Sequence, residues 1–345
     1  MLAPRNLRLF RSKQREARDI EVLPSGLAGG AAVLWPLGTR AQQPAMPVIG
    51  WLSARSPAEA ASVLQAFRQG LGQVGYFEGK NVTIEYRWAE GRYERLPALA
   101  AELVSHQVAL IAATGGEPSP LAAKAATTTI PIVCTLGGDP VETGLVASLN
   151  RPGGNLTGTT VMTLEMASKR VDFLHQVAPT ATAAAMLINP KFTPASAEAR
   201  EVQNAARSLG ININLLNAST ESEIDAAFTT IVEQRNGALI IGTDPFLLGQ
   251  RDQVVRLAAR HMIPTMYFLR EFVEAGGLMS YGPNIANGYR QAGVYTGLIL
   301  NGANPAVLPI VRPTQFQLYL NLKTAKAQGL QIPPLLLALA DVVIE

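Results

Sequence analysis

Short apolar runs alternate with longer amphipathic, Ala-rich stretches along most of this chain. Apolar runs of strand length, separated by amphipathic stretches of helix length, indicate βαβ units and parallel sheets. The apolar runs fall into two groups of four. The first group covers residues 48–53, 82–88, 108–114 and 131–136, and the second covers residues 184–189, 211–216, 237–243 and 264–268.

The two groups have nearly the same spacing. Counted from the first run of each group, the runs begin at positions 0, 34, 60 and 83 in one half and 0, 27, 53 and 80 in the other. Both halves also place an Asp-Pro pair shortly after a run, at Asp139 and at Asp244. A chain of 345 residues with this repeat predicts two α/β lobes of one design.

One extended segment lies between the two groups and two more follow the second group, and their Gly and Pro residues are typical of crossings and turns rather than helices. They lie at residues 150–158, 277–284 and 308–316, and a helix is expected between the last two, from about 285 to 300. Three such segments predict a three-segment hinge. We expect lobe 1 to comprise residues 44–157 and 282–308, and lobe 2 to comprise residues 158–281 and 309–345.

The excess of positive charge is confined to the start of the chain. Residues 1–41 hold seven of the 29 Lys and Arg and three of the 26 Asp and Glu, which leaves 22 basic and 23 acidic residues in the remaining 304. Those basic residues are scattered singly among acidic ones. Because phosphate binding requires a basic stripe or patch, this distribution excludes a nucleic-acid partner.

The first 41 residues resemble a secretory leader. A basic segment precedes the apolar run 26–37, and Ala41 is followed by a polar Gln-Gln-Pro. This order predicts a signal peptide cleaved near Ala41 and a periplasmic mature protein; an uncleaved tail is the alternative. The apolar run is shorter than the roughly 20 residues that cross a bilayer, so we expect no membrane span in the mature chain.

Metal, cofactor and nucleophile motifs are absent from the sequence. The three histidines, His106, His175 and His261, are far apart, and Cys134 is the one cysteine. No dinucleotide-binding glycine motif, P-loop or Gly-x-Ser-x-Gly sequence occurs. We therefore expect no metal, no cofactor and no catalytic residue.

Ligands of open α/β sheets bind beyond the carboxyl ends of the strands, where loops lead into helices. Hydroxyl groups and glycine N–H groups suit a carboxylate at these positions, and an aspartate suits an ammonium group. The candidate ligand-binding residues are Ser53, Thr114, Gly115, Gly116 and Asp139 from the first half, with Asn189, Thr243, Asp244 and Tyr281 from the second.

Several of these residues also have purely structural interpretations. Ser53 is a residue type that caps helices, and Gly115 and Gly116 satisfy turn geometry. The Asp-Pro pairs are typical of turns, and the ring of Tyr281 suits packing as well as stacking on a ligand. The sequence leaves these alternatives open.

Several phrases of the chain resemble the ABC-transporter substrate-binding proteins of the family that includes tryptophan and tyrosine binders. The resemblance covers about residues 44–345 and is strongest at residues 139–146, 149–158, 274–282 and 321–326. It implies a type I periplasmic-binding-protein fold, with two Rossmann-like lobes that close on a small-molecule ligand. It also implies delivery of that ligand to the membrane permease of an ABC transporter.

We therefore expect an exported solute-binding protein of an ABC importer. Its ligand would be small and carboxylate-bearing, an amino acid or an aromatic acid, held between the two lobes. Two alternatives are a ligand-sensing receptor domain of the same fold and a two-lobed enzyme such as a racemase. The racemase would use one cysteine from each lobe, whereas this chain has a single cysteine.

Overall fold

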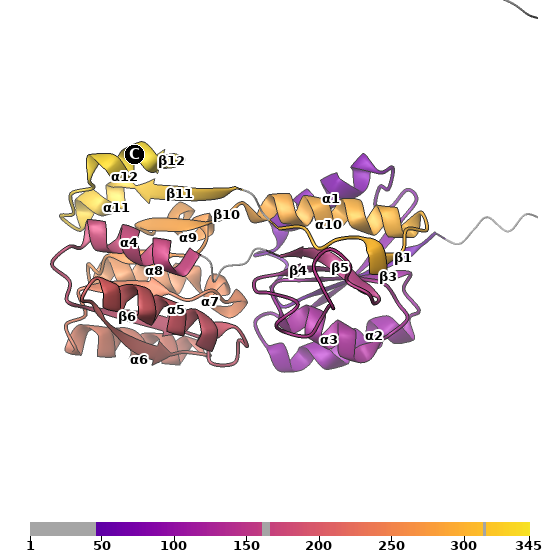
Figure 1. Ribbon diagram of the computed structural model, residues 1–345, viewed down its shortest axis with the longest axis horizontal. Helices are drawn as coiled ribbons and strands as arrows, with labels where there is room; N and C mark the ends of the chain where they lie inside the picture. The colour runs from indigo at the N-terminus through magenta and orange to yellow at the C-terminus, as the bar shows by residue number, and fades with distance from the viewer. Residues whose placement is uncertain (1–45, 161–165, 313–314) are drawn as a thin grey trace, which may run out of the picture. The chain divides into compact units, whose positions relative to one another are not determined.

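The computed structural model of the protein describes residues 46–160, 166–312 and 315–345. Within them the predicted apolar runs form two β-sheets, each flanked by helices (Figure 1). All eight predicted strands are confirmed, with ends that agree to within two residues. The leader predicted for residues 1–41 lies outside the described residues.

The first sheet has five parallel strands in the order β2-β1-β3-β4-β5. Strands β3 and β4 are buried along their whole length and β1 from its second residue onward, which explains their continuous apolar sequences. The strands are β1 (Val48–Ser53), β2 (Thr83–Trp88), β3 (Leu110–Thr114), β4 (Ile132–Leu136) and β5 (Leu156–Thr160). The helices of this lobe are α1 (Ala61–Gln73), α2 (Leu96–Ser105), α3 (Pro118–Ala126) and α10 (Ile285–Leu300), with the 3-10 turns η1 (Tyr93–Arg95) and η3 (Pro305–Val307).

The second sheet has seven strands in the order β12-β11-β10-β9-β8-β6-β7. Its strands are β6 (Ala183–Ile188), β7 (Asn212–Asn217), β8 (Ala238–Ile241), β9 (Thr265–Tyr267), β10 (Met279–Pro283), β11 (Phe316–Asn321) and β12 (Val342–Ile344). Its helices are α4 (Ala167–Val177), α5 (Ala195–Ser208), α6 (Glu221–Glu233), α7 (Pro245–Gly249), α8 (Arg251–Arg260), α9 (Arg270–Glu274), α11 (Leu322–Ala327) and α12 (Pro334–Leu339). The prediction of parallel sheets holds except for β10 and β11, which pair antiparallel.

The extended segments expected to connect the lobes contain strands of their own. Strand β5 begins in the first segment, β10 lies in the second, and β11 begins at the end of the third. Strands β5 and β10 were not predicted because they are short and rich in Gly, Thr or Pro. Strand β11 was not predicted because its start lies in a Pro-containing segment that was expected to be a crossing. The lobe boundaries expected after residues 157 and 281 fall within β5 and β10.

The chain passes between the two sheets three times. It leaves the first sheet after β5, returns from β10 to α10 across Asn284, and leaves again between Val311 and β11. Residues 161–165 and 313–314, in the first and third crossings, lie outside the described residues. Within the described ranges, no helix has both the length and the hydropathy needed to cross a bilayer.

Helix α10 packs against α1 although more than 200 residues separate them in the sequence. The two helix backbones touch at glycines. A Cβ atom at Gly70 would overlap the carbonyl oxygen of Arg290, and one at Gly293 would overlap the carbonyl oxygen of Phe67. This close approach fixes α10, and the cavity residues near its start, to the first lobe.

Replacement of Gly293 by Ala is expected to destabilise the protein. The new methyl group would force α1 and α10 apart, and overpacking of this kind typically costs 1–3 kcal/mol of unfolding free energy. The measurement is urea denaturation followed by circular dichroism. Gly72→Ala is the matched control, since it meets only the ring of Phe77 and gains helix propensity. Equal stabilities of the two variants would contradict the close-packing account.

Candidate functional site

A cavity lies between the two lobes at the carboxyl ends of their strands. It encloses about 520 Å³ of space between protein atoms, part of which is continuous with solvent. From the first lobe it is lined by Arg55, Gly115, Gly116, Thr135, Leu136 and Gly137, together with Ile285 and Tyr289 of α10. From the second lobe it is lined by Phe192, Thr243, Asp244, Pro245, Leu248, Phe268, Leu269 and Pro283.

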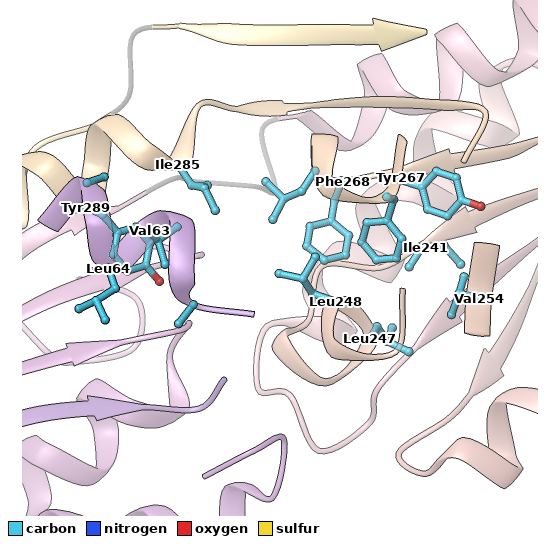
Figure 2. Packing of buried hydrophobic residues seen from close by; sticks show 14 of the residues in the cluster. Val63, Leu64, Ile241, Leu247, Leu248, Val254, Tyr267, Phe268, Ile285 and Tyr289 are labelled. Carbon is cyan, nitrogen blue, oxygen red and sulfur yellow. The ribbon is translucent and has the colours of Figure 1, made fainter. Parts of the chain in front are cut away.

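Apolar side chains line both sides of the cavity. Figure 2 shows Tyr289 and Ile285 on one side and Phe268 and Leu248 on the other, all within one buried apolar cluster. The second lobe adds a further aromatic ring, Phe192. The apolar walls therefore suit a ligand with a substantial hydrophobic or aromatic body.

Four of the nine candidate residues line the cavity: Gly115, Gly116, Thr243 and Asp244. Gly115 and Gly116 have φ values of 83° and 96°, a left-handed conformation that favours glycine. A Cβ atom at Gly116 would also lie only 3.0 Å from the ring of Pro245, across the lobe boundary. The turn geometry therefore favours glycine at both positions, and at Gly116 the close approach to the second lobe favours it as well.

The other five candidates lie outside the cavity lining. Ser53 and Thr114 are fully buried at the ends of β1 and β3, and the Ser53 hydroxyl accepts from the backbone N–H of Arg55 at 3.2 Å. Asp139 accepts from the Val141 N–H at 2.7 Å, as expected for an Asx turn. Asn189 contacts Asp244, and Tyr281 packs its ring edge-on against Phe173. Direct ligand contact by these five stays a prediction.

Arg55, which the sequence analysis missed, is the cation of the cavity. It is only 7% exposed, and its guanidinium carbon lies 5.9 Å from the centroid of the Tyr289 ring. Within the described part of the chain no carboxylate forms an ion pair with it, and its buried Nε atom has no hydrogen-bond partner. Because buried charges are normally paired, this arrangement suits an anionic group from a ligand.

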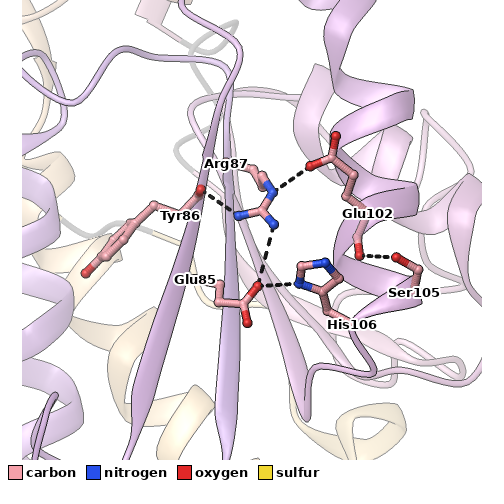
Figure 3. Close-up of polar contacts among 6 residues, drawn as sticks. All are labelled: Glu85, Tyr86, Arg87, Glu102, Ser105 and His106. Carbon is pink, nitrogen blue, oxygen red and sulfur yellow. Dashed lines mark hydrogen bonds and ion pairs between the residues drawn. The ribbon is translucent and has the colours of Figure 1, made fainter.

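Arg87, in the same lobe, differs from Arg55 because it is paired with acidic side chains. Its side chain lies 2.8 Å from Glu102 and 3.6 Å from Glu85, and Glu85 also contacts His106 at 2.8 Å (Figure 3). This network is partly exposed and lies outside the cavity lining. Arg87 therefore has its charge partners within the protein, whereas Arg55 does not.

Asp244 is held by three hydrogen bonds at the start of α7. Its Oδ1 accepts from the Leu247 N–H at 2.7 Å and caps the helix. Its Oδ2 accepts from the Tyr93 hydroxyl at 2.6 Å and from the Asn189 amide at 3.2 Å. Tyr93 belongs to the first lobe, so this carboxylate joins the two lobes directly; we call the Tyr93–Asp244 contact the interlobe bond.

The interlobe bond is buried, and burial changes the acidity of both groups. Burial raises the pKa of Asp244 to about 6, although its hydrogen bonds act in the opposite direction. Burial and the nearby carboxylate raise the pKa of Tyr93 well above its ordinary value. Tyr93 therefore stays protonated and donates, while Asp244 gains its proton at a higher pH than an exposed aspartate.

A buried ion pair supports the second-lobe side of the cavity. Arg170, 1% exposed, donates to Glu198 at 2.9 Å and to the backbone carbonyl of Tyr281 at 2.8 Å. Glu198 in turn accepts from the backbone N–H and the hydroxyl of Thr243, each at 2.8 Å. These contacts tie strand β10 to the residue that precedes Asp244. Tyr281 thus contributes its carbonyl to this network and its ring to the core.

The metal-binding potential of the described residues is low. Over residues 46–160, 166–312 and 315–345, no group of three His, Cys, Asp or Glu side chains is arranged to hold a metal ion. Burial raises the pKa of the Cys134 thiol, which keeps it protonated and unreactive.

Replacement of Asp244 by Asn is expected to change how stability depends on pH. A carboxyl pKa raised from 3.8 to about 6 by folding means that the folded state binds the proton more tightly. Protonation of Asp244 therefore stabilises the folded state at low pH, and this stabilisation is lost as the pH rises through about 6. The unfolding free energy of the wild type, relative to Asp244→Asn, should therefore increase by up to about 3 kcal/mol from pH 7 to pH 4. A pH-independent difference in urea denaturation would contradict the raised pKa.

The comparisons with known proteins agree with this geometry. The family model "ABC transporter substrate binding protein" matches residues 55–344. A tyrosine-binding protein of Clostridioides difficile is 26% identical over 268 residues, which cover 77% of this chain and 76% of that protein. These relatives are binding proteins and not enzymes, so the racemase alternative is set aside.

Two solved structures have the same fold. The ABC domain from Streptococcus pneumoniae in complex with L-Trp has a TM-score of 0.79 at 23% identity, and a conserved domain protein from Vibrio cholerae has a TM-score of 0.79 at 24% identity. Each comparison covers 86% of this chain and 99% of the other. The two lobes thus have the periplasmic-binding-protein fold, and the family model spans most of the sequence. The chain belongs to the ABC transporter substrate-binding protein family.

Proposed function

We propose that this protein is the exported solute-binding protein of an ABC importer and that it captures a small, carboxylate-bearing ligand between its lobes. Membership of the family implies a small-molecule ligand and a permease partner. The carboxylate is supported by Arg55, a buried cation that faces the cavity and has no acidic partner in the described residues. A ligand carboxylate would satisfy the guanidinium with charge-assisted hydrogen bonds.

The apolar walls support an aromatic or branched body on the ligand. Phe192, Phe268 and Leu248 come from the second lobe, while Tyr289 comes from the first, so each lobe would contact the same ligand. The tyrosine-binding relative and the L-Trp complex are consistent with a ligand that has an aromatic body. Closure of the lobes would bury the hydrophobic body and exclude water from the Arg55 contact.

Replacement of Arg55 by Met is expected to weaken ligand binding about 30- to 100-fold. Loss of a hydrogen-bonded charge contact costs about 2–2.7 kcal/mol in binding free energy. Thermal-shift screening of aromatic and branched carboxylates would find the strongest ligand, and isothermal titration calorimetry would measure its Kd with each variant. Arg87→Met is the matched control, because that arginine lies in the surface network of Figure 3. An unchanged Kd in the Arg55→Met variant would contradict the proposed contact between Arg55 and the ligand carboxylate.

Export is part of the proposal and is tested separately. The leader predicted for residues 1–41 would be removed near Ala41, which leaves Gln42 at the mature N-terminus. Intact-mass spectrometry of the protein from the periplasmic fraction should give the mass of the chain from about Gln42. A periplasmic product that retains Met1 would contradict cleavage of the leader.

A further inference from the structure

We infer that the hydroxyl group of Thr135 binds the ligand carboxylate together with Arg55, which makes Thr135 a specificity-determining residue of the cavity. The inference rests on the proposed function, because it assumes that the ligand carboxylate contacts Arg55. It adds an uncharged contact to the same group, from a nearby strand of the same sheet.

Four hydroxyl side chains form a row across the carboxyl edge of the first sheet. Ser53 on β1 is in register with Thr114 on β3, and Thr135 on β4 is in register with Thr159 on β5. Strands β3 and β4 also pair through the residues just before, which makes Thr114 and Thr135 neighbours. Side chains in one register row of a parallel sheet point to the same face, so the four hydroxyls lie on one side of the sheet.

This side of the sheet is the one that α10 covers. Val133, two residues before Thr135 and therefore on the same face, belongs to the buried cluster that contains Tyr289 of α10. Ile285 and Tyr289 of that helix line the cavity (Figure 2). The hydroxyl row and the α10 wall of the cavity thus lie on the same side of the sheet.

The four hydroxyls differ in whether they have partners. The Ser53 hydroxyl accepts from the backbone N–H of Arg55 at 3.2 Å, and the Thr159 hydroxyl donates to a backbone carbonyl of α10 at 3.5 Å. The hydroxyls of Thr114 and Thr135 have no hydrogen-bond partner among the described residues. The two inner members of the row are therefore the ones that a ligand group could satisfy.

Of these two, Thr135 is the residue that faces the cavity. Thr135 is 6% exposed and lines the cavity, whereas Thr114 is 0% exposed and does not line it. A buried hydroxyl without a partner is unfavourable, because it has lost its hydrogen bonds to water. A ligand group that bonds to Thr135 would remove this penalty, and no water would have to be displaced from an exposed hydroxyl to do so.

The position of Thr135 assigns it to the carboxylate rather than to an ammonium group. Arg55 follows β1 and Thr135 ends β4, and the glycine turn at Gly115 and Gly116, after β3, lies between them along the edge of the sheet. Asp244, the acid among the described lining residues, lies in the second lobe, so it would attract the ammonium group of an amino acid to the opposite side. A carboxylate has two oxygens and can accept from a guanidinium and from a hydroxyl at once.

Two variants of nearly the same shape separate the cavity hydroxyl from its neighbour. Thr135→Val replaces the hydroxyl in the cavity by a methyl group, and the matched control Thr114→Val does the same on the adjacent strand, outside the cavity lining. Neither change leaves a buried partner unsatisfied, so both variants should unfold at the wild-type urea midpoint or above it. Thr135→Ser keeps the hydroxyl and should restore binding.

Isothermal titration calorimetry on the purified protein at pH 7.5 gives the Kd of each variant. The probes are L-phenylalanine, L-tyrosine and L-tryptophan, each with the acid that lacks its ammonium group: 3-phenylpropanoate, 3-(4-hydroxyphenyl)propanoate and indole-3-propanoate. In the best-binding pair, Thr135→Val should weaken the amino acid and the acid alike by about tenfold or more, the size of effect expected for a lost hydrogen bond to a charged group. Thr114→Val and Thr135→Ser should bind with close to wild-type affinity.

An unchanged Kd in Thr135→Val, or an equal loss of affinity in Thr114→Val, would overturn the inference. A loss confined to the amino acids would mean that the hydroxyl contacts the ammonium group, which overturns the carboxylate contact of Thr135. In each of these cases the proposed function stands if Arg55→Met still weakens binding. If the wild type binds none of the six probes, the proposed function fails together with the inference.

Discussion

The carboxylate of Asp244 is the contact on which the rest of the site depends. It caps α7 in the second lobe, accepts from Asn189, and accepts the interlobe bond from Tyr93 in the first lobe. One buried group thus sets the local structure of a cavity loop and the relation of that loop to the opposite lobe. Both roles require the carboxylate to be buried, and this loss of solvation raises its pKa.

The two lobes supply different chemistry to the cavity. The first lobe contributes Arg55 and the glycine turns at the ends of its strands, while the second contributes most of the apolar wall and the Asp244 carboxylate. A ligand that satisfies both therefore needs an anionic end and a hydrophobic end. Family membership identifies the protein as a substrate-binding protein. The cationic and apolar parts of the lining restrict the ligands that fit to molecules with both features.

The repeated βα pattern could be predicted because buried parallel strands are continuous apolar runs, which can be recognised in the sequence without knowledge of the tertiary structure. Strand β5, with the sequence Leu-Thr-Gly-Thr-Thr, was not predicted, since its burial depends on β4 and α10. The loops after β3 and β8 supplied the four candidates that line the cavity. Arg55 was missed because arginine is normally exposed, and its burial depends on Tyr289 from a distant helix.

The packing of α10 on α1 has a consequence for the order in which the chain becomes structured. The first lobe receives one of its helices only after the whole β6–β10 region has been made, and the second sheet receives β11 and β12 last of all. Neither half can complete its core on the ribosome before almost the entire polypeptide has emerged. A protein threaded in this way therefore remains incompletely folded until synthesis is nearly finished.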